Sequence, residues 1–169
     1  MKRFLLPLLL CLFACPVFAQ TQGQQAQKDL SDQLKVDATT GFNSMTPSKQ
    51  GALNTKAYAL SLRPDCVVQQ NLDDGDEAIV DGDLDITWGD QDKGTADGYY
   101  GTAIAEHNVG FAHWQIGEYG TAADHYYAAC QAFQMSIWYY NYAQEHYSDA
   151  DSNFENAACQ YYDGQEEPE

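Results

Sequence analysis

The four histidines of the chain are the first candidates for metal binding or acid–base chemistry: His107, His113, His125 and His146. His113 and His125 flank Gly117, so a helix reversal at that glycine would bring their imidazole rings face to face. No HExxH, ExxH or paired-cysteine spacing accompanies the histidines, although helical zinc sites depend on such spacings. We therefore expect structural or surface roles for the histidines and predict no metal site.

An acidic run between residues 73 and 92 is the second candidate. Three of its aspartates have the 1-3-5 spacing of a calcium-binding EF-hand loop: Asp81, Asp83 and Asp85. The sixth position is Ile86, where the sharp turn of that loop needs glycine, and the twelfth is Asp92, where a bidentate glutamate is expected. We interpret the run as a solvated acidic segment, with weak divalent-cation binding as the alternative.

Nucleophilic catalysis has little support in the sequence. Cys130 lies in the middle of an apolar helical pattern, away from the helix N-terminus that would lower the pKa of its thiol. The chain has no glycine-rich phosphate loop before a helix, no GxSxG and no kinase signature. We predict a non-enzymatic protein with no catalytic residues and no cofactor.

Residues 1–19 have the pattern of an export signal. Lys2 and Arg3 precede an apolar run, and Ala19 supplies the small residue at the expected cleavage site. Residues 12–15 also resemble a lipobox, which leaves lipid anchoring through Cys15 as the alternative. The apolar run is too short to cross a bilayer, so we expect no transmembrane segment and an exported protein, periplasmic or extracellular.

The excess of acidic over basic residues limits the classes of molecule that we expect as binding partners. The chain has 169 residues, 25 of them acidic and 8 basic, which gives a net charge of −17; loss of Lys2 and Arg3 on cleavage deepens it to −19. This charge repels phosphates, so nucleic acids are disfavoured as partners. A hydrophobic content of 44% still favours one folded domain.

The mature chain divides into segments of different character. We predict a Gln-rich flexible segment at residues 20–45, a helical domain at 46–163 and an acidic tail at 164–169. Thr46–Pro47 predicts the start of a helix that ends at Arg63–Pro64. Residues 66–96 fit either a helix or a strand. Further helices are expected at these positions: 98–115, 119–145 with a break near Gln134, and 149–161 opened by Ser148 or Asp149.

Residues 103–136 resemble a tetratricopeptide (TPR) repeat of 34 residues. The small and aromatic positions that carry the resemblance are Gly110, Gly117, Tyr119, Ala122, Tyr126 and Ala129. A second quartet, Tyr147, Ala150, Phe154 and Ala157, repeats the spacing of the last four after 28 residues. The resemblance implies an all-α fold of antiparallel helical hairpins in a short TPR-like array. It also makes the helices of Cys130 and Cys159 neighbours, so in an oxidising compartment we expect these two to form a disulfide.

Residues 94–169 have an unusual composition, with twelve acidic residues, eleven of the twelve tyrosines and no Lys or Arg. Tyrosine offers a large contact area with a polar tip, and carboxylates favour a basic partner. The candidate partner-binding residues are Tyr99, Tyr100, Glu106, Tyr139, Tyr140, Tyr142 and Glu145. We predict an exported module that binds a protein or peptide, expected to be basic; an acidic cation-buffering or structural envelope protein is the alternative. The oligomeric state stays open.

Overall fold

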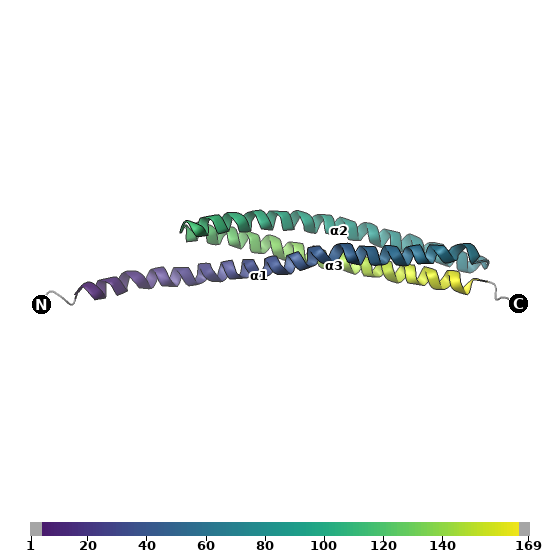
Figure 1. Cartoon of the computed structure of the whole chain (residues 1–169), viewed down its shortest axis with the longest axis horizontal. Coiled ribbons are helices and arrows are strands. Elements are labelled where there is room, and N and C mark those ends of the chain that lie inside the picture. Colours follow the sequence, from purple (N-terminus) through teal and green to yellow (C-terminus); the bar gives the residue numbers. More distant parts are fainter. Residues whose placement is uncertain (1–4, 166–169) are drawn as a thin grey trace. The chain divides into compact units, whose positions relative to one another are not determined.

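Three long helices make up almost all of the chain. The computed structural model describes residues 5–165, with side chains from residue 22 onward. Helix α1 spans Leu5–Leu62, α2 spans Gln69–Gln115 and α3 spans Tyr119–Asp163, and a short 3-10 helix, Arg63–Asp65, follows α1 (Figure 1). The described residues contain no β-strand beyond an isolated bridge between Cys66 and Gln165. The predicted all-α class is confirmed, and most of the ambiguous segment 66–96 is helix.

Two helix boundaries predicted from the sequence are confirmed. α1 ends at Leu62, directly before Arg63–Pro64. The chain reverses between α2 and α3 at Gly117, whose φ of 82° lies in the left-handed region that favours glycine. The amide of Glu118 donates to the carbonyl of His113 and that of Gly117 to Trp114, as at other glycine-terminated helices.

Other predicted boundaries are wrong. α3 continues through Gln134 and through Ser148–Asp149, where we expected breaks. α1 runs unbroken across Thr46–Pro47, with Pro47 on an exposed face, and residues 20–45, for which we expected a flexible segment, also lie within it. Buried residues continue with helical spacing on both sides of each of these points, so tertiary packing outweighs the local preferences for a turn or cap. The predicted export signal and acidic tail include residues 1–4 and 166–169, which lie outside the described part.

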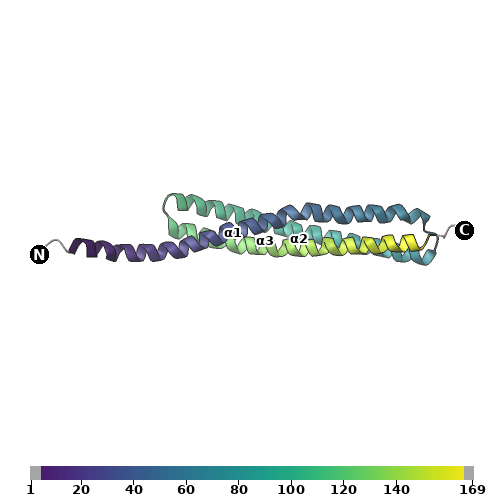
Figure 2. The same cartoon turned by 60° about the horizontal axis from the view of Figure 1, so that its bottom comes forward.

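The described residues form two compact units. The first combines α1 up to Ala38 with residues 99–135, and the second combines residues 39–98 with 136–165. In the second unit, stretches of all three helices lie side by side in both views, and α2 runs antiparallel to α1 and α3 (Figures 1 and 2). The amides of Val67 and Val68 donate to the carbonyl of Gly164, which ties the connection between α1 and α2 to the end of α3.

The second unit packs aromatic rings of α3 against glycines of α2. Three such pairs follow one another at seven-residue steps along both helices: Gly75 with Tyr161, Gly82 with Phe154, and Gly89 with Tyr147. A Cβ atom at any of these glycines would lie less than 3.0 Å from a ring carbon. Buried alanines recur at the same step on α3 and α1, among them Ala143, Ala150 and Ala157, and Ala52 and Ala59. A seven-residue repeat of buried positions is the pattern of helices packed as in a coiled coil.

In the second unit, ion pairs at seven-residue steps join α1, and the 3-10 helix that follows it, to α2. Lys49 pairs with Asp90 at 2.6 Å, Lys56 with Asp83 at 2.5 Å and Arg63 with Asp76 at 2.6 Å. Two of these aspartates also accept a hydrogen bond from a buried tyrosine of α3: Asp90 from Tyr147 at 2.8 Å and Asp76 from Tyr161 at 2.6 Å. Midway between these two tyrosines, α3 carries Phe154, which has no hydroxyl group. The Lys56 ammonium lies over the ring of Phe154.

The first unit contains the helical hairpin expected at residues 103–136. Gly110 of α2 faces the ring of Tyr126 and the carbonyl of Ala122, and Tyr126 is fully buried. His107 is also buried, and its Nδ1 lies 3.0 Å from the Ser31 hydroxyl of α1. Beyond this hairpin, the long helices replace the 34-residue units that a TPR-like array would contain.

Candidate functional site

The candidate partner-binding residues divide between the two units. Tyr99, Tyr100 and Glu106 belong to the first unit, whereas Tyr139, Tyr140, Tyr142 and Glu145 belong to the second. In the first unit the ring of Tyr100 lies 6.2 Å from that of Phe133, and Glu106 contacts Nδ1 of His125 at 2.7 Å. The candidates therefore form two groups, one in each unit.

Tyr140 is a core residue, and the prediction that it is an exposed contact is wrong. Its exposed fraction is 1%. The ring packs against Gly41 and, edge to face, against Phe42 of α1, and the hydroxyl donates to Asp97 at 2.8 Å. The reason is the register: Tyr140 precedes Tyr147 by seven residues and occupies the next buried aromatic position of α3.

An exposed aromatic cluster lies next to Tyr140 on α3. The ring of Trp138 makes edge-to-face contacts with Tyr139 at 5.1 Å and with Tyr142 at 4.9 Å. Trp138 is 48% exposed and Tyr142 39%. Glu145 follows Tyr142 by three residues, so Trp138, Tyr142 and Glu145 share one face of the helix. We call these three residues together with Tyr139 the α3 patch. Sequence reasoning missed Trp138, although its four-residue spacing to Tyr142 was visible.

Helix α3 contains no Lys or Arg that could neutralise the carboxylates around the α3 patch. Of the six Lys and Arg residues after Ala19, five form ion pairs with aspartates of this chain: Lys28, Lys49, Lys56, Arg63 and Lys93. All six precede residue 94, whereas α3 carries acidic side chains and no Lys or Arg. These five ion pairs lie within and between α1, the 3-10 helix and α2, whereas α3 keeps a net negative charge.

Three of the histidines contact other side chains of this chain, and these contacts account for their positions in the fold. The rings of His113 and His125 stack at 5.5 Å across the Gly117 reversal, as expected, and their Nδ1 atoms contact Glu118 and Glu106. His107 lies between Ser31 and Asp32, and burial lowers its pKa. These contacts fit the structural roles predicted for these residues.

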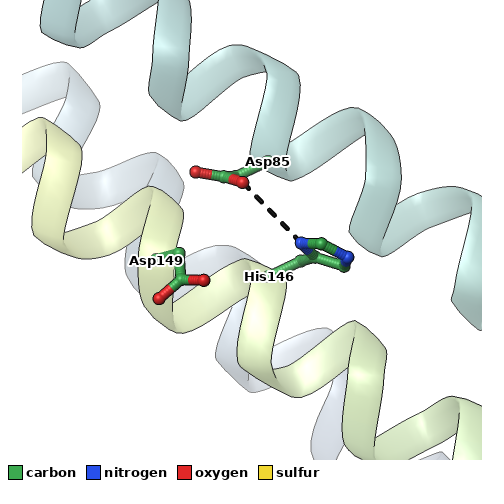
Figure 3. Close-up of side chains that lie close together, drawn as sticks. All are labelled: Asp85, His146 and Asp149. Atoms are coloured by element: carbon green, nitrogen blue, oxygen red, sulfur yellow. Dashed lines mark ion pairs between the residues drawn. The ribbon is translucent and has the colours of Figure 1, made fainter.

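His146 differs from the other histidines, because it lies beside two aspartates. Asp85 of α2 and His146 and Asp149 of α3 each place one potential ligand atom within 4.8 Å of the others (Figure 3). Nδ1 of His146 is buried and has no hydrogen-bond partner, and it lies 3.7 Å from Oδ1 of Asp85. The sequence showed the three-residue step from His146 to Asp149, but Asp85 joins them only through the register of α2 against α3.

The acidic run of α2 does not form a loop. It lies within one continuous helix, where residues spaced 1-3-5 point in different directions. Asp83 pairs with Lys56, and Oδ2 of the buried Asp85 accepts a hydrogen bond from Asn153 at 2.9 Å. These contacts are incompatible with an EF-hand loop at these positions.

The predicted disulfide between Cys130 and Cys159 is wrong. Both cysteines are free and both lie on α3, where about eight helical turns separate them. A disulfide needs Cα atoms within about 7 Å of each other. Cys130 is buried, and burial raises the pKa of its thiol, which makes it a weak nucleophile.

No protein-family model, curated protein or solved structure matches the chain. In the part of the chain that the structure describes, none of the helices combines the length and the apolar character needed to span a membrane.

Proposed function

We propose that this chain is an exported, non-enzymatic helical module that binds a basic protein or peptide through the α3 patch. The observation that carries the proposal is the exposure of Trp138 and Tyr142 beside Glu145, on a helix without Lys or Arg. Aromatic rings supply contact area at low cost in side-chain entropy, and the surrounding carboxylates attract a cationic partner.

The TPR resemblance contributes to this proposal only at residues 103–136. The reversal at Gly117 and the contact of Gly110 with Tyr126 agree with the packing that the resemblance implies. Export through residues 1–19, with lipid anchoring through Cys15 as the alternative, belongs to the same proposal and rests on the sequence.

A synthetic lysine-rich peptide tests the proposal by isothermal titration calorimetry. The double substitution Trp138→Ala/Tyr142→Ala should weaken binding by about tenfold, because truncation of central aromatic residues costs ~1–2 kcal/mol at typical interfaces. Tyr162→Ala is the matched control, since Tyr162 is a 64% exposed tyrosine on the same helix and in the same unit. Added salt should weaken binding to the wild type. Equal affinities of the double variant and the control would refute a role for the patch.

A further inference from the structure

We propose that Asp85, His146 and Asp149 bind one divalent transition-metal ion of the zinc class between α2 and α3. The proposal is independent of the proposed partner binding, because none of these residues belongs to the α3 patch. All three lie in the second unit, so the site does not depend on how the units are arranged.

The spacing of the ligand atoms fits a shared metal better than a hydrogen bond. Nδ1 of His146 and Oδ1 of Asp85 are 3.7 Å apart, beyond the usual 2.7–3.2 Å of an N–H···O bond. Two ligands bound to one zinc ion at ~2.0–2.1 Å in tetrahedral geometry lie about 3.4 Å apart. The third ligand atom, from Asp149, falls within the same 4.8 Å limit. Closure of the three ligand atoms from within 4.8 Å to about 3.4 Å of one another would complete a three-ligand site.

The unpaired Nδ1 of His146 is the second observation in favour of a metal. This nitrogen is buried and accepts or donates no hydrogen bond, although buried polar atoms in native proteins nearly always have a partner. Figure 3 shows the imidazole of His146 projecting from α3 toward Asp85, with Asp149 on the next turn of the same helix. A bound cation would satisfy the lone pair that the protein leaves unused.

A neighbouring side chain orients one of the three ligands, and two more side chains lie beside the imidazole. The Asn153 amide donates to Oδ2 of Asp85, which leaves Oδ1 for the metal. Nε2 of His146 lies 3.6 Å from Asp92, and the Trp88 ring packs 5.6 Å from the imidazole. At 3.6 Å the Asp92 carboxylate is not hydrogen-bonded to Nε2; closer approach would make it the partner that fixes the tautomer of a ligating imidazole and raises its basicity.

The donor set selects the class of ion. Calcium and magnesium take oxygen ligands, whereas an imidazole with carboxylates suits zinc and the other first-row divalent ions. Two carboxylates balance the charge of a divalent ion. Five of the six Lys and Arg residues after Ala19 form their ion pairs with aspartates other than Asp85 and Asp149.

Zinc chloride is the probe, added to metal-free protein and followed by isothermal titration calorimetry. We expect one zinc ion per chain and a melting temperature that rises with zinc, because a ligand of the native state stabilises it. Asp149→Asn should weaken zinc binding at least ~10-fold, and because Asp149 is exposed, this variant should fold. The control Asp163→Asn removes the same charge from another exposed position of α3 and should bind zinc like the wild type.

Cobalt substitution gives a second readout that surface carboxylates do not produce. Cobalt(II) bound through an imidazole in a four-coordinate site should give visible absorption bands, and His146→Gln should remove them while His125→Gln should not. Zinc binding that is equal in Asp149→Asn and Asp163→Asn would overturn the proposal. So would cobalt bands that survive His146→Gln and disappear in His125→Gln.

Discussion

Gly82 of α2 lies directly against the ring of Phe154 of α3, at a distance that leaves no room for a methyl group. The same relationship joins Gly75 to Tyr161 and Gly89 to Tyr147, so glycines on one helix form the holes that aromatic rings of the other fill. In the second unit this interlocking sets the register of α2 against α3, and it thereby places Asp85 opposite His146.

Gly82→Ala should destabilise the protein. The new Cβ would meet the Phe154 ring, and overpacking of this kind costs about 1–3 kcal/mol. Gly94→Ala is the control on the same helix, because its Cβ would meet nothing within 4 Å; there the change should stabilise by about 0.5–1 kcal/mol. Urea denaturation measures both. A neutral Gly82→Ala would contradict the packing described here.

Tyr140→Ala should destabilise the protein about as much as Tyr126→Ala. Both rings are buried, and truncation of a buried aromatic residue costs about 3–5 kcal/mol. Tyr139→Ala, next to Tyr140 but only half-buried, should cost less. Thermal unfolding followed by circular dichroism compares the melting temperatures of the three variants. An unchanged melting temperature in Tyr140→Ala would contradict the assignment of Tyr140 to the buried face of α3.

Stability should fall below pH 4 in part because of Asp76. Hydrogen bonds from Arg63 and Tyr161 lower the pKa of Asp76 from 3.8 to about 2. A carboxyl with a lowered pKa in the native state stabilises it above pH 4, and this contribution is lost as the pH falls toward 2. The melting temperature should therefore depend less steeply on pH in Asp76→Asn than in the wild type over this range. Identical slopes would show that the Arg63 pair contributes nothing measurable.

Thiol labelling should distinguish the three cysteines whose side chains the structure describes. Cys159 is exposed, whereas Cys66 and Cys130 are buried. A maleimide added to the native protein should modify Cys159 first, and all three should react after unfolding without a reducing agent. Peptide mapping by mass spectrometry locates the label, and a Cys130–Cys159 cross-link within one chain would contradict a continuous α3.

The all-α class and the reversal at Gly117 were predictable because they follow from local signals. The seven-residue repeat was also visible, since the 28-residue offset between the two quartets that resemble a TPR helix is four times seven. The sequence of residues 66–96 does not by itself distinguish a helix from a strand. Asp74–Gly75 and Asp81–Gly82 favour turns locally, but these glycines receive aromatic rings from α3, and that packing decides the helix.

The candidate sites were less predictable than the fold. The tyrosine and carboxylate composition of residues 94–169 singled out candidate contacts, yet it could not separate Tyr140, which is buried, from Tyr142, which is exposed. That distinction needs the register of the helix. Asp85 and His146 are distant in sequence, and only the antiparallel pairing of α2 with α3 shows that they are neighbours.

Backbone amide NMR of the isotopically labelled protein, titrated with the lysine-rich peptide, tests the proposed function most directly. The largest shift changes should fall at residues 138–145 of α3, around Trp138, Tyr142 and Glu145, and they should shrink as salt is added. Shift changes centred on the acidic run of α2, or spread evenly over the acidic residues, would contradict binding through the α3 patch.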